Sequence, residues 1–213
     1  MPSDHALLTP PPLQMVPRRQ PGVLTLTQSN FDQACKTLYD LACLSGMPDL
    51  LVAIPTGGLW VAQAMARSSR TAQPILPLTC RRPGTDAKRS SSLLRMAIAR
   101  LPRPALDRLR LLEHRLINRT PPRPDQRSFD RAELAALREW FTARPPHQAV
   151  LVVDDAVDSG ATLHAVCTQI RQIAPHAVLR SAAITVTTAA PLARPDHALY
   201  DRRLCRFPWS LDA

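Results

Sequence analysis

A chain of 213 residues, 45% of them hydrophobic, is long enough for one sizeable domain with a buried core. Aromatic residues make up only 4%, so the core must consist mainly of Leu, Val, Ile and Ala. No apolar stretch is long enough to cross a bilayer, so a membrane is not expected among the partners. The net charge of +10 leaves three explanations open: an anionic ligand, a nucleic acid, or a solvated basic face.

Two features bear on the compartment. The N-terminus lacks the long apolar segment of a secretory signal. The five cysteines are scattered and form no CxxC pair, which is typical of reduced core residues rather than of a disulfide framework. We therefore expect a cytoplasmic protein.

The first part of the chain predicts an arm followed by alternating strands and helices. Residues 1–22 are rich in proline and have no periodic pattern, which indicates a disordered or extended arm before a domain over 23–213. The pattern then predicts an edge strand over 23–27, a helix from about Ser29 to Gly46, a buried strand over 50–54, a helix to about Arg67, and an edge strand over 75–79.

The middle of the chain is basic. Residues 81–92 are polar and contain glycine, which favours a mobile loop, and residues 93–144 look helical throughout, punctuated by prolines. Much of the excess positive charge lies within 81–131. Aromatic residues are nearly absent between these arginines, which argues against stacking of nucleic-acid bases on this surface.

The most informative stretch is 149–173. The apolar run 150–153 suits a strand buried on both faces of a parallel sheet, and Asp154 and Asp155 follow it. A loop of small and hydroxyl residues over 156–162 leads into a helix with an apolar face, and a last strand is expected at about 182–186. Strands that alternate with helices predict an α/β fold with a parallel sheet.

This stretch is suited to a phosphorylated ribose. The helix N-terminus offers N–H groups to a phosphate, Gly160 allows close approach of the backbone, and Ser159 and Thr162 add hydroxyl groups. The carboxylates of Asp154 and Asp155 can bind ribose hydroxyls or a hydrated Mg²⁺. The motifs of Walker loops and of dinucleotide-binding folds are both absent from the sequence.

The segment VLVVDDAVDSGATL resembles the phosphoribosyl-diphosphate (PRPP) loop of type I phosphoribosyltransferases. The order of segments, and Phe207-Pro208-Trp209 near the C-terminus, resemble bacterial xanthine/guanine-type members over roughly 23–80 and 148–210. The resemblance implies a parallel-sheet, Rossmann-like fold with a helical insertion at about 93–144. It also implies a homodimer and Mg²⁺-dependent transfer of the 5-phosphoribosyl group from PRPP to a nitrogenous base, with release of pyrophosphate.

The resemblance assigns roles to individual residues. Asp154 and Asp155 would hold ribose and metal, and Asp158 would act as the catalytic base. PRPP-binding residues would be Asp154, Asp155, Ala156, Val157, Asp158, Ser159, Gly160, Ala161 and Thr162. Pyrophosphate would contact Thr56, Gly57 and Gly58, with Arg81, Arg82 and Lys88 from a loop closing over the site. Thr187 and Trp209 would contact the base.

Plainer interpretations of the same residues stay open. The glycine pair can be a tight turn, Asp158 a helix cap, Trp209 an apolar plug, and the loop cations a solvated surface. The sequence also departs from the family. Thr56 stands where members often carry Arg or Lys, and Thr187 lies near the position of a lysine that contacts the purine 6-oxo group. A second hypothesis is therefore a non-catalytic, PRPP-sensing regulator that binds nucleic acid through the basic helical segment.

Overall fold

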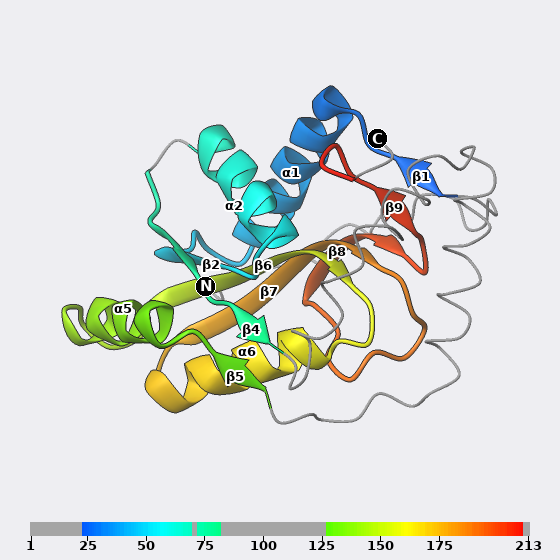
Figure 1. The fold of residues 1–213 in the computed structure, drawn as a ribbon. Coiled ribbons are helices and arrows are strands. Elements are labelled where there is room, and N and C mark those ends of the chain that lie inside the picture. The colour runs from blue at the N-terminus through cyan, green and yellow to red at the C-terminus, as the bar shows by residue number, and fades with distance from the viewer. Residues whose placement is uncertain (1–22, 70–71, 82–126, 211–213) are drawn as a thin grey trace, which may run out of the picture.

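The computed structural model describes residues 23–69, 72–81 and 127–210 (Figure 1). The predicted arm, Arg82, Lys88 and most of the predicted helical insertion lie outside these residues. The elements in chain order are β1 (Leu24–Thr25), α1 (Gln28–Cys43), β2 (Leu50–Ala53), α2 (Gly57–Ser68), β3 (Ile75–Pro77), β4 (Cys80–Arg81), β5 (Ser128–Phe129), α5 (Arg131–Thr142), β6 (Ala149–Val157), α6 (Ala161–Ile173), β7 (Val178–Val186), β8 (His197–Asp201) and β9 (Cys205–Arg206).

The main sheet confirms the predicted α/β class. It has five parallel strands in the order β3-β2-β6-β7-β8, so the strand that carries the acid pair is central. Residues 150–153 of this strand are completely buried, as the unbroken apolar run predicts. β3 lies at the edge of the sheet, in agreement with the presence of Pro77.

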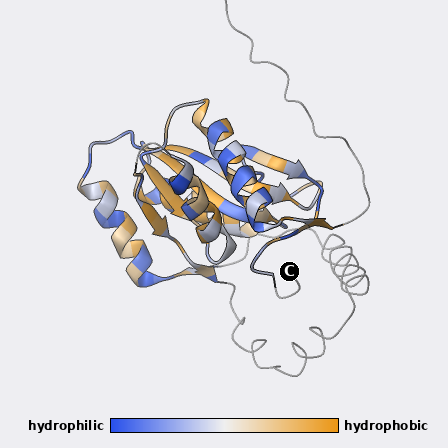
Figure 2. Cartoon of the chain, turned by 90° about the horizontal axis from the view of Figure 1, so that it is seen from above, coloured by the Kyte–Doolittle hydropathy of each residue, from blue (hydrophilic) through white to orange (hydrophobic). Residues whose placement is uncertain are grey.

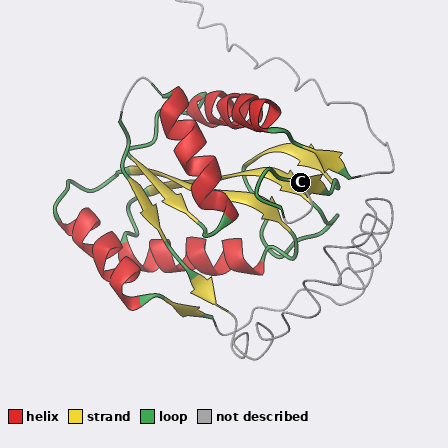
Figure 3. Cartoon of the chain, turned by 45° about the horizontal axis from the view of Figure 1, so that its top comes forward, coloured by secondary structure: helices red, strands yellow, loops and turns green. Residues whose placement is uncertain are grey.

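Helices cover both faces of the sheet. α1 and α2 lie on one face, and α5 and α6 lie on the other (Figures 1 and 3). The alternation of side chains along β6 divides its residues between the two layers: Leu151 and Val153 pack toward α1 and α2, whereas Val150 and Val152 pack toward α5 and α6. Figure 2 shows the apolar strands enclosed by helices of mixed polarity, which is the pattern expected of a three-layer fold.

Several predicted boundaries were wrong. β6 runs through the acid pair to Val157, because Asp154, Ala156 and Val157 pair with β7. β7 begins at Val178 rather than near 182, and it is followed by β8 and β9, which the sequence analysis missed.

Two further predictions concern helices. α1 begins at Gln28, one residue before the predicted start near Ser29, and its N-cap is Thr27, whose hydroxyl accepts a hydrogen bond from the Asn30 N–H. The region predicted to be helical over 93–144 contains a strand, Ser128–Phe129, which pairs with β4 in an antiparallel two-stranded sheet. Pairing with a distant partner decided this local structure, and the local sequence pattern does not contain that information.

The five cysteines are free, and Cys35 and Cys167 are buried, as predicted for core residues. Within the described residues, no helix combines the length and the apolar character that crossing a membrane requires.

Candidate functional site

The carboxyl ends of three neighbouring strands bring the predicted site residues together. β2 leads into Gly57 and Gly58, β6 carries the acid pair, and β7 leads into Thr187. The register places Ala53 beside Val153 and Val157 beside Val186. Ligands of parallel α/β sheets bind beyond these ends of the strands. The fold therefore places the three predicted segments at one edge of the sheet.

Asp154 and Asp155 form a tightly coupled acid pair. The carboxylate of Asp154 is almost completely buried and accepts a hydrogen bond from the Asp155 N–H at 3.0 Å. Burial raises the pKa of Asp154 well above its ordinary value, and the charge of Asp155 raises it further. Burial also raises the pKa of Asp155. A cation bound here would reverse this effect, because it stabilises the charged form of both groups.

The acid pair fits the requirements of Mg²⁺. This ion commonly takes one or two carboxylates from the protein and completes its shell with water and substrate phosphates. Within the described residues, no group of three His, Cys, Asp or Glu side chains is placed to bind a metal. The two carboxylates of the acid pair would suit an ion that arrives with a phosphorylated ligand.

Gly57 and Gly58 are required by close packing. A Cβ atom on Gly57 would lie 2.0 Å from Oδ2 of Asp155, and one on Gly58 would lie 2.4 Å from the carbonyl oxygen of Val153. The start of α2 therefore lies directly against the acid pair. Thr56 is exposed beside the acid pair, and the peptide between Pro55 and Thr56 is cis.

The loop after β6 is shorter than predicted. It consists of Asp158, Ser159 and Gly160, and α6 begins at Ala161. Gly160 has φ 72° and a Cβ there would lie 2.4 Å from the carbonyl oxygen of Ala193, so both conformation and space require glycine. The Ala161 N–H points to the Ser159 hydroxyl at 3.4 Å. The loop thus presents a helix N-terminus, the arrangement that binds phosphate in many folds.

Arg127 immediately precedes β5 and reaches the start of α6. Its guanidinium donates a hydrogen bond of 2.7 Å to Oγ1 of Thr162. This places a cation beside the predicted phosphate site. Sequence analysis did not single out Arg127, because it is 35 positions away from Thr162 and one of many arginines in the middle of the chain.

Asp158 is held by the end of β7. The Thr187 hydroxyl donates to Oδ1 of Asp158 at 2.6 Å, and the Thr188 hydroxyl donates to the backbone oxygen of Asp158 at 2.9 Å. Both threonines are buried. The position where the family resemblance places a lysine therefore contacts the predicted catalytic base.

Trp209 belongs to an aromatic cluster. Its ring stacks on Phe207 with centroids 5.0 Å apart and on Trp60 at 6.2 Å, and it meets Phe31 edge-on at 5.0 Å. Trp60, in the first turn of α2, is 51% exposed and was not predicted as a site residue. Through this ring, Trp209 is connected to the helix that begins with Gly57 and Gly58.

The loop cations divide into two groups. Arg81 is exposed and lies in β4, where it pairs with Ser128. Arg82 and Lys88 are outside the described residues, so their predicted contact with pyrophosphate stays a prediction.

Comparison with known proteins shows the fold. Neither a family model nor a curated protein matches the chain. A purine phosphoribosyltransferase from Pyrococcus horikoshii superimposes with a TM-score of 0.56 and 15% identity over 89% of this chain and 95% of the other. A xanthine-guanine-hypoxanthine phosphoribosyltransferase from Helicobacter pylori gives 0.55 and 16% over 89% and 94%. A hypothetical protein from Neisseria gonorrhoeae with bound ppGpp gives 0.51 and 15% over 90% and 91%.

The chain thus has the fold of type I phosphoribosyltransferases, and the resemblance inferred from the sequence is confirmed at the level of structure.

Proposed function

We propose that the protein is a Mg²⁺-dependent phosphoribosyltransferase that transfers the 5-phosphoribosyl group from PRPP to a nitrogenous base and releases pyrophosphate. The observation that carries this proposal is the contact between the acid pair and the two glycines. The carboxylate of Asp155 lies against Gly57, so a group that binds diols or metal adjoins a helix N-terminus that binds anions.

The roles follow from the positions of the residues. Asp154 and Asp155 bind the ribose hydroxyls and would hold the metal. The bound metal ion would neutralise negative charge on the leaving pyrophosphate. The start of α6 holds the 5′-phosphate, and Arg127 positions Thr162 and adds positive charge there. Gly57 and Gly58 let the backbone approach the pyrophosphate. The exposed Thr56 beside them contacts the pyrophosphate as well.

The reaction exchanges one bond at the anomeric carbon. The carbon–oxygen bond to pyrophosphate breaks, and a bond to the nitrogen of the acceptor forms. The proton on that nitrogen passes to the carboxylate of Asp158, which Thr187 orients through the 2.6 Å hydrogen bond. The acceptor is a purine-like or atypical base. A cation at the position of Thr187 would favour a purine carbonyl, and the neutral hydroxyl of Thr187 does not provide that preference.

The aromatic cluster of Phe31, Trp60, Phe207 and Trp209 forms the wall of the acceptor site in this proposal. Trp60 is its exposed member and lies one turn from the glycines. Exposed aromatic rings stack on planar bases, which gives affinity without selecting one base. Trp209 then supports Trp60 as well as contacting the base.

The second hypothesis, a PRPP-sensing regulator, has one specific observation in its favour. The neighbour from Neisseria gonorrhoeae is described with bound ppGpp and without a stated activity. A chain of this fold can therefore bind a guanosine nucleotide. The basic segment that would bind nucleic acid in this chain lies mostly outside the described residues.

The test is pyrophosphate release from PRPP and Mg²⁺ across a panel of purine and pyrimidine bases. A salt-dependent binding assay with DNA and RNA runs beside it. Release that needs both a base and Mg²⁺ supports the enzyme. Binding of PRPP and nucleic acid without release supports the regulator and contradicts the enzyme.

A further inference from the structure

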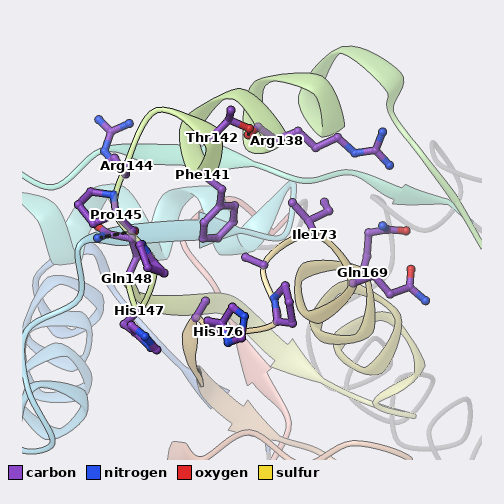
Figure 4. Close-up of a pocket in the computed structure, with 15 residues that line it drawn as sticks. Arg138, Phe141, Thr142, Arg144, Pro145, His147, Gln148, Gln169, Ile173 and His176 are labelled. Atoms are coloured by element: carbon purple, nitrogen blue, oxygen red, sulfur yellow. Dashed lines mark hydrogen bonds between the residues drawn. The ribbon is translucent and has the colours of Figure 1, made fainter.

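A pocket of about 630 Å³ opens at the end of the sheet opposite to the acid pair. It lies between the C-terminal turns of α5 and α6 and the loops that follow them, over 143–148 and 174–177 (Figure 4). Gln148 lines it and immediately precedes β6, whereas Asp155 lies near the other end of that strand. The two sites are therefore roughly 20 Å apart at 3.3 Å per residue of strand. The volume is in the range of small-molecule sites.

The charge of the lining favours an anion. Arg138 and Arg144 contribute two cations, and the rings of His147 and His176 lie 5.7 Å apart. Among the described residues that line the pocket, none is acidic. An anion entering here would be attracted by the arginines and would meet no carboxylate among these residues, and this attraction must outweigh the negative dipole ends of α5 and α6, whose C-terminal turns line the pocket.

Arg144 is held in place before any ligand binds. Its guanidinium lies 4.4 Å from the centroid of the Trp140 ring and donates a hydrogen bond of 3.1 Å to the Trp140 backbone oxygen. A cation that is already ordered loses less conformational entropy when it binds an anion.

The rest of the lining suits a planar ring with polar edges. Phe141 and Ile173 lie near the middle of the pocket in Figure 4 and provide apolar surface. Three glutamines provide amide groups that both donate and accept hydrogen bonds, namely Gln148, Gln169 and Gln172. Apolar surface with a few polar groups and adjacent cations is the combination that a nucleotide requires.

His147 has an unusual backbone. Its φ is 70°, in the left-handed region that favours glycine. The Gln148 side chain, which donates to the Pro145 backbone oxygen at 3.2 Å, closes the same loop. A histidine kept in a disfavoured conformation at the rim of a pocket suggests a use for its imidazole.

From these observations we propose that this pocket is a second ligand site that binds a nucleoside monophosphate. His147 and His176 bind the phosphate, Arg138 and Arg144 on opposite sides of the pocket add positive charge around it, and the apolar floor with its glutamines receives the base (Figure 4). The site is separate from the proposed PRPP site and does not depend on catalytic activity.

The test is a titration of the full chain with GMP, followed by NMR of the histidine rings. His147 and His176 report on the pocket, whereas His164, in the first turn of α6, reports on the proposed PRPP site. We expect the His147 and His176 signals to move and saturate together. GMP binding at the PRPP site alone would move only His164, and that result would overturn the proposal.

Variants give a second criterion. Arg138→Gln should weaken the affinity read from His176 about tenfold, because the pocket loses one of its two arginine charges. Arg131→Gln, on the exposed start of the same helix, is the matched control and should leave the affinity unchanged. His147→Asn keeps a residue that tolerates the left-handed region and should also weaken binding without unfolding the chain.

Separate arms test the two halves of the ligand. Guanosine alone and inorganic phosphate alone should each bind more weakly than GMP. Equal affinity for phosphate and GMP would show that the ring plays no part and would overturn a nucleotide site, as would an Arg138→Gln variant that binds GMP as tightly as the unmodified protein.

Discussion

The Thr187 hydroxyl donates a 2.6 Å hydrogen bond to Oδ1 of Asp158. Thr187 lies one residue beyond the end of β7, and Asp158 lies one residue beyond the end of β6. The parallel register of Val157 with Val186 brings the two side chains together. The residue that replaces the expected lysine thus orients the proposed base.

Thr187→Val tests this relationship. The valine has nearly the same shape but cannot donate, so the Asp158 carboxylate loses an orienting hydrogen bond. We expect turnover with the best acceptor to fall about tenfold while PRPP affinity is kept, since one hydrogen bond to a charged group contributes about 1.5–3 kcal/mol. Thr185→Val, which removes a buried hydroxyl bonded to the Arg203 backbone oxygen, is the control. Equal losses in both variants would show that Thr187 has only a structural role.

Gly57→Ala tests the contact between α2 and the acid pair. The new methyl group would lie 2.0 Å from Oδ2 of Asp155, so the carboxylate must move. Displacement of a positioning group by about 1 Å costs about a hundredfold in rate. We expect turnover to fall on this scale and the Mg²⁺ concentration needed for half-maximal rate to rise. An unchanged Mg²⁺ requirement would contradict the role given to Asp155.

Asp154→Asn should stabilise the protein at neutral pH and abolish activity. The pKa of Asp154 is raised above its ordinary value of 3.8, because burial disfavours the charged form. The folded state then binds the proton more tightly than the unfolded state, so the carboxylate reduces stability as the pH rises through and above 3.8.

Asparagine removes this effect and keeps an oxygen for the Asp155 N–H. Each unit of elevated pKa corresponds to about 1.4 kcal/mol, so Tm should rise at pH 7 and the difference should shrink toward pH 4. Thermal unfolding across this pH range is the measurement. A variant that is less stable than the unmodified protein at pH 7 would contradict the assignment.

Arg127→Gln should raise the KM for PRPP about tenfold with a smaller effect on kcat. The guanidinium beside Thr162 adds positive charge where the 5′-phosphate is proposed to bind. Arg171→Gln is the matched control. Arg171 lies in the last turn of α6, the helix that contains Thr162, so this variant removes an equal charge at the far end of that helix. Equal KM values for the two variants would remove Arg127 from the site.

The sequence predicted the parts of the site that depend on local pattern. The continuous apolar run 150–153 and the acid pair after it predicted a central strand with a ligand at its end, and both the strand and its position are confirmed. The glycines after β2 were assigned to the pyrophosphate site by the family resemblance, with a tight turn as the alternative, and the close approach of Asp155 explains why no larger residue fits at Gly57.

Contacts between distant segments were not predictable in this way. Arg127 contacts Thr162 because the strand that follows it, β5, pairs with β4, which lies more than 40 positions earlier in the chain. Thr187 meets Asp158 because β6 extends further than its apolar run, and that extension is due to pairing with β7. The sequence around Trp60 predicts only a helix, and its stacking with Trp209 depends on where the C-terminal segment lies in the fold. Each depends on tertiary pairing that local propensity does not encode.

The most direct measurement is mass detection of the product formed from PRPP, Mg²⁺ and a mixture of bases, with the unmodified protein and with Asp155→Asn. The proposal predicts a nucleotide whose mass equals that of one base plus the phosphoribosyl group, formed together with an equal amount of pyrophosphate. It also predicts that Asp155→Asn stays folded and loses this product. PRPP left intact with every base, or a product formed equally by Asp155→Asn, would contradict it.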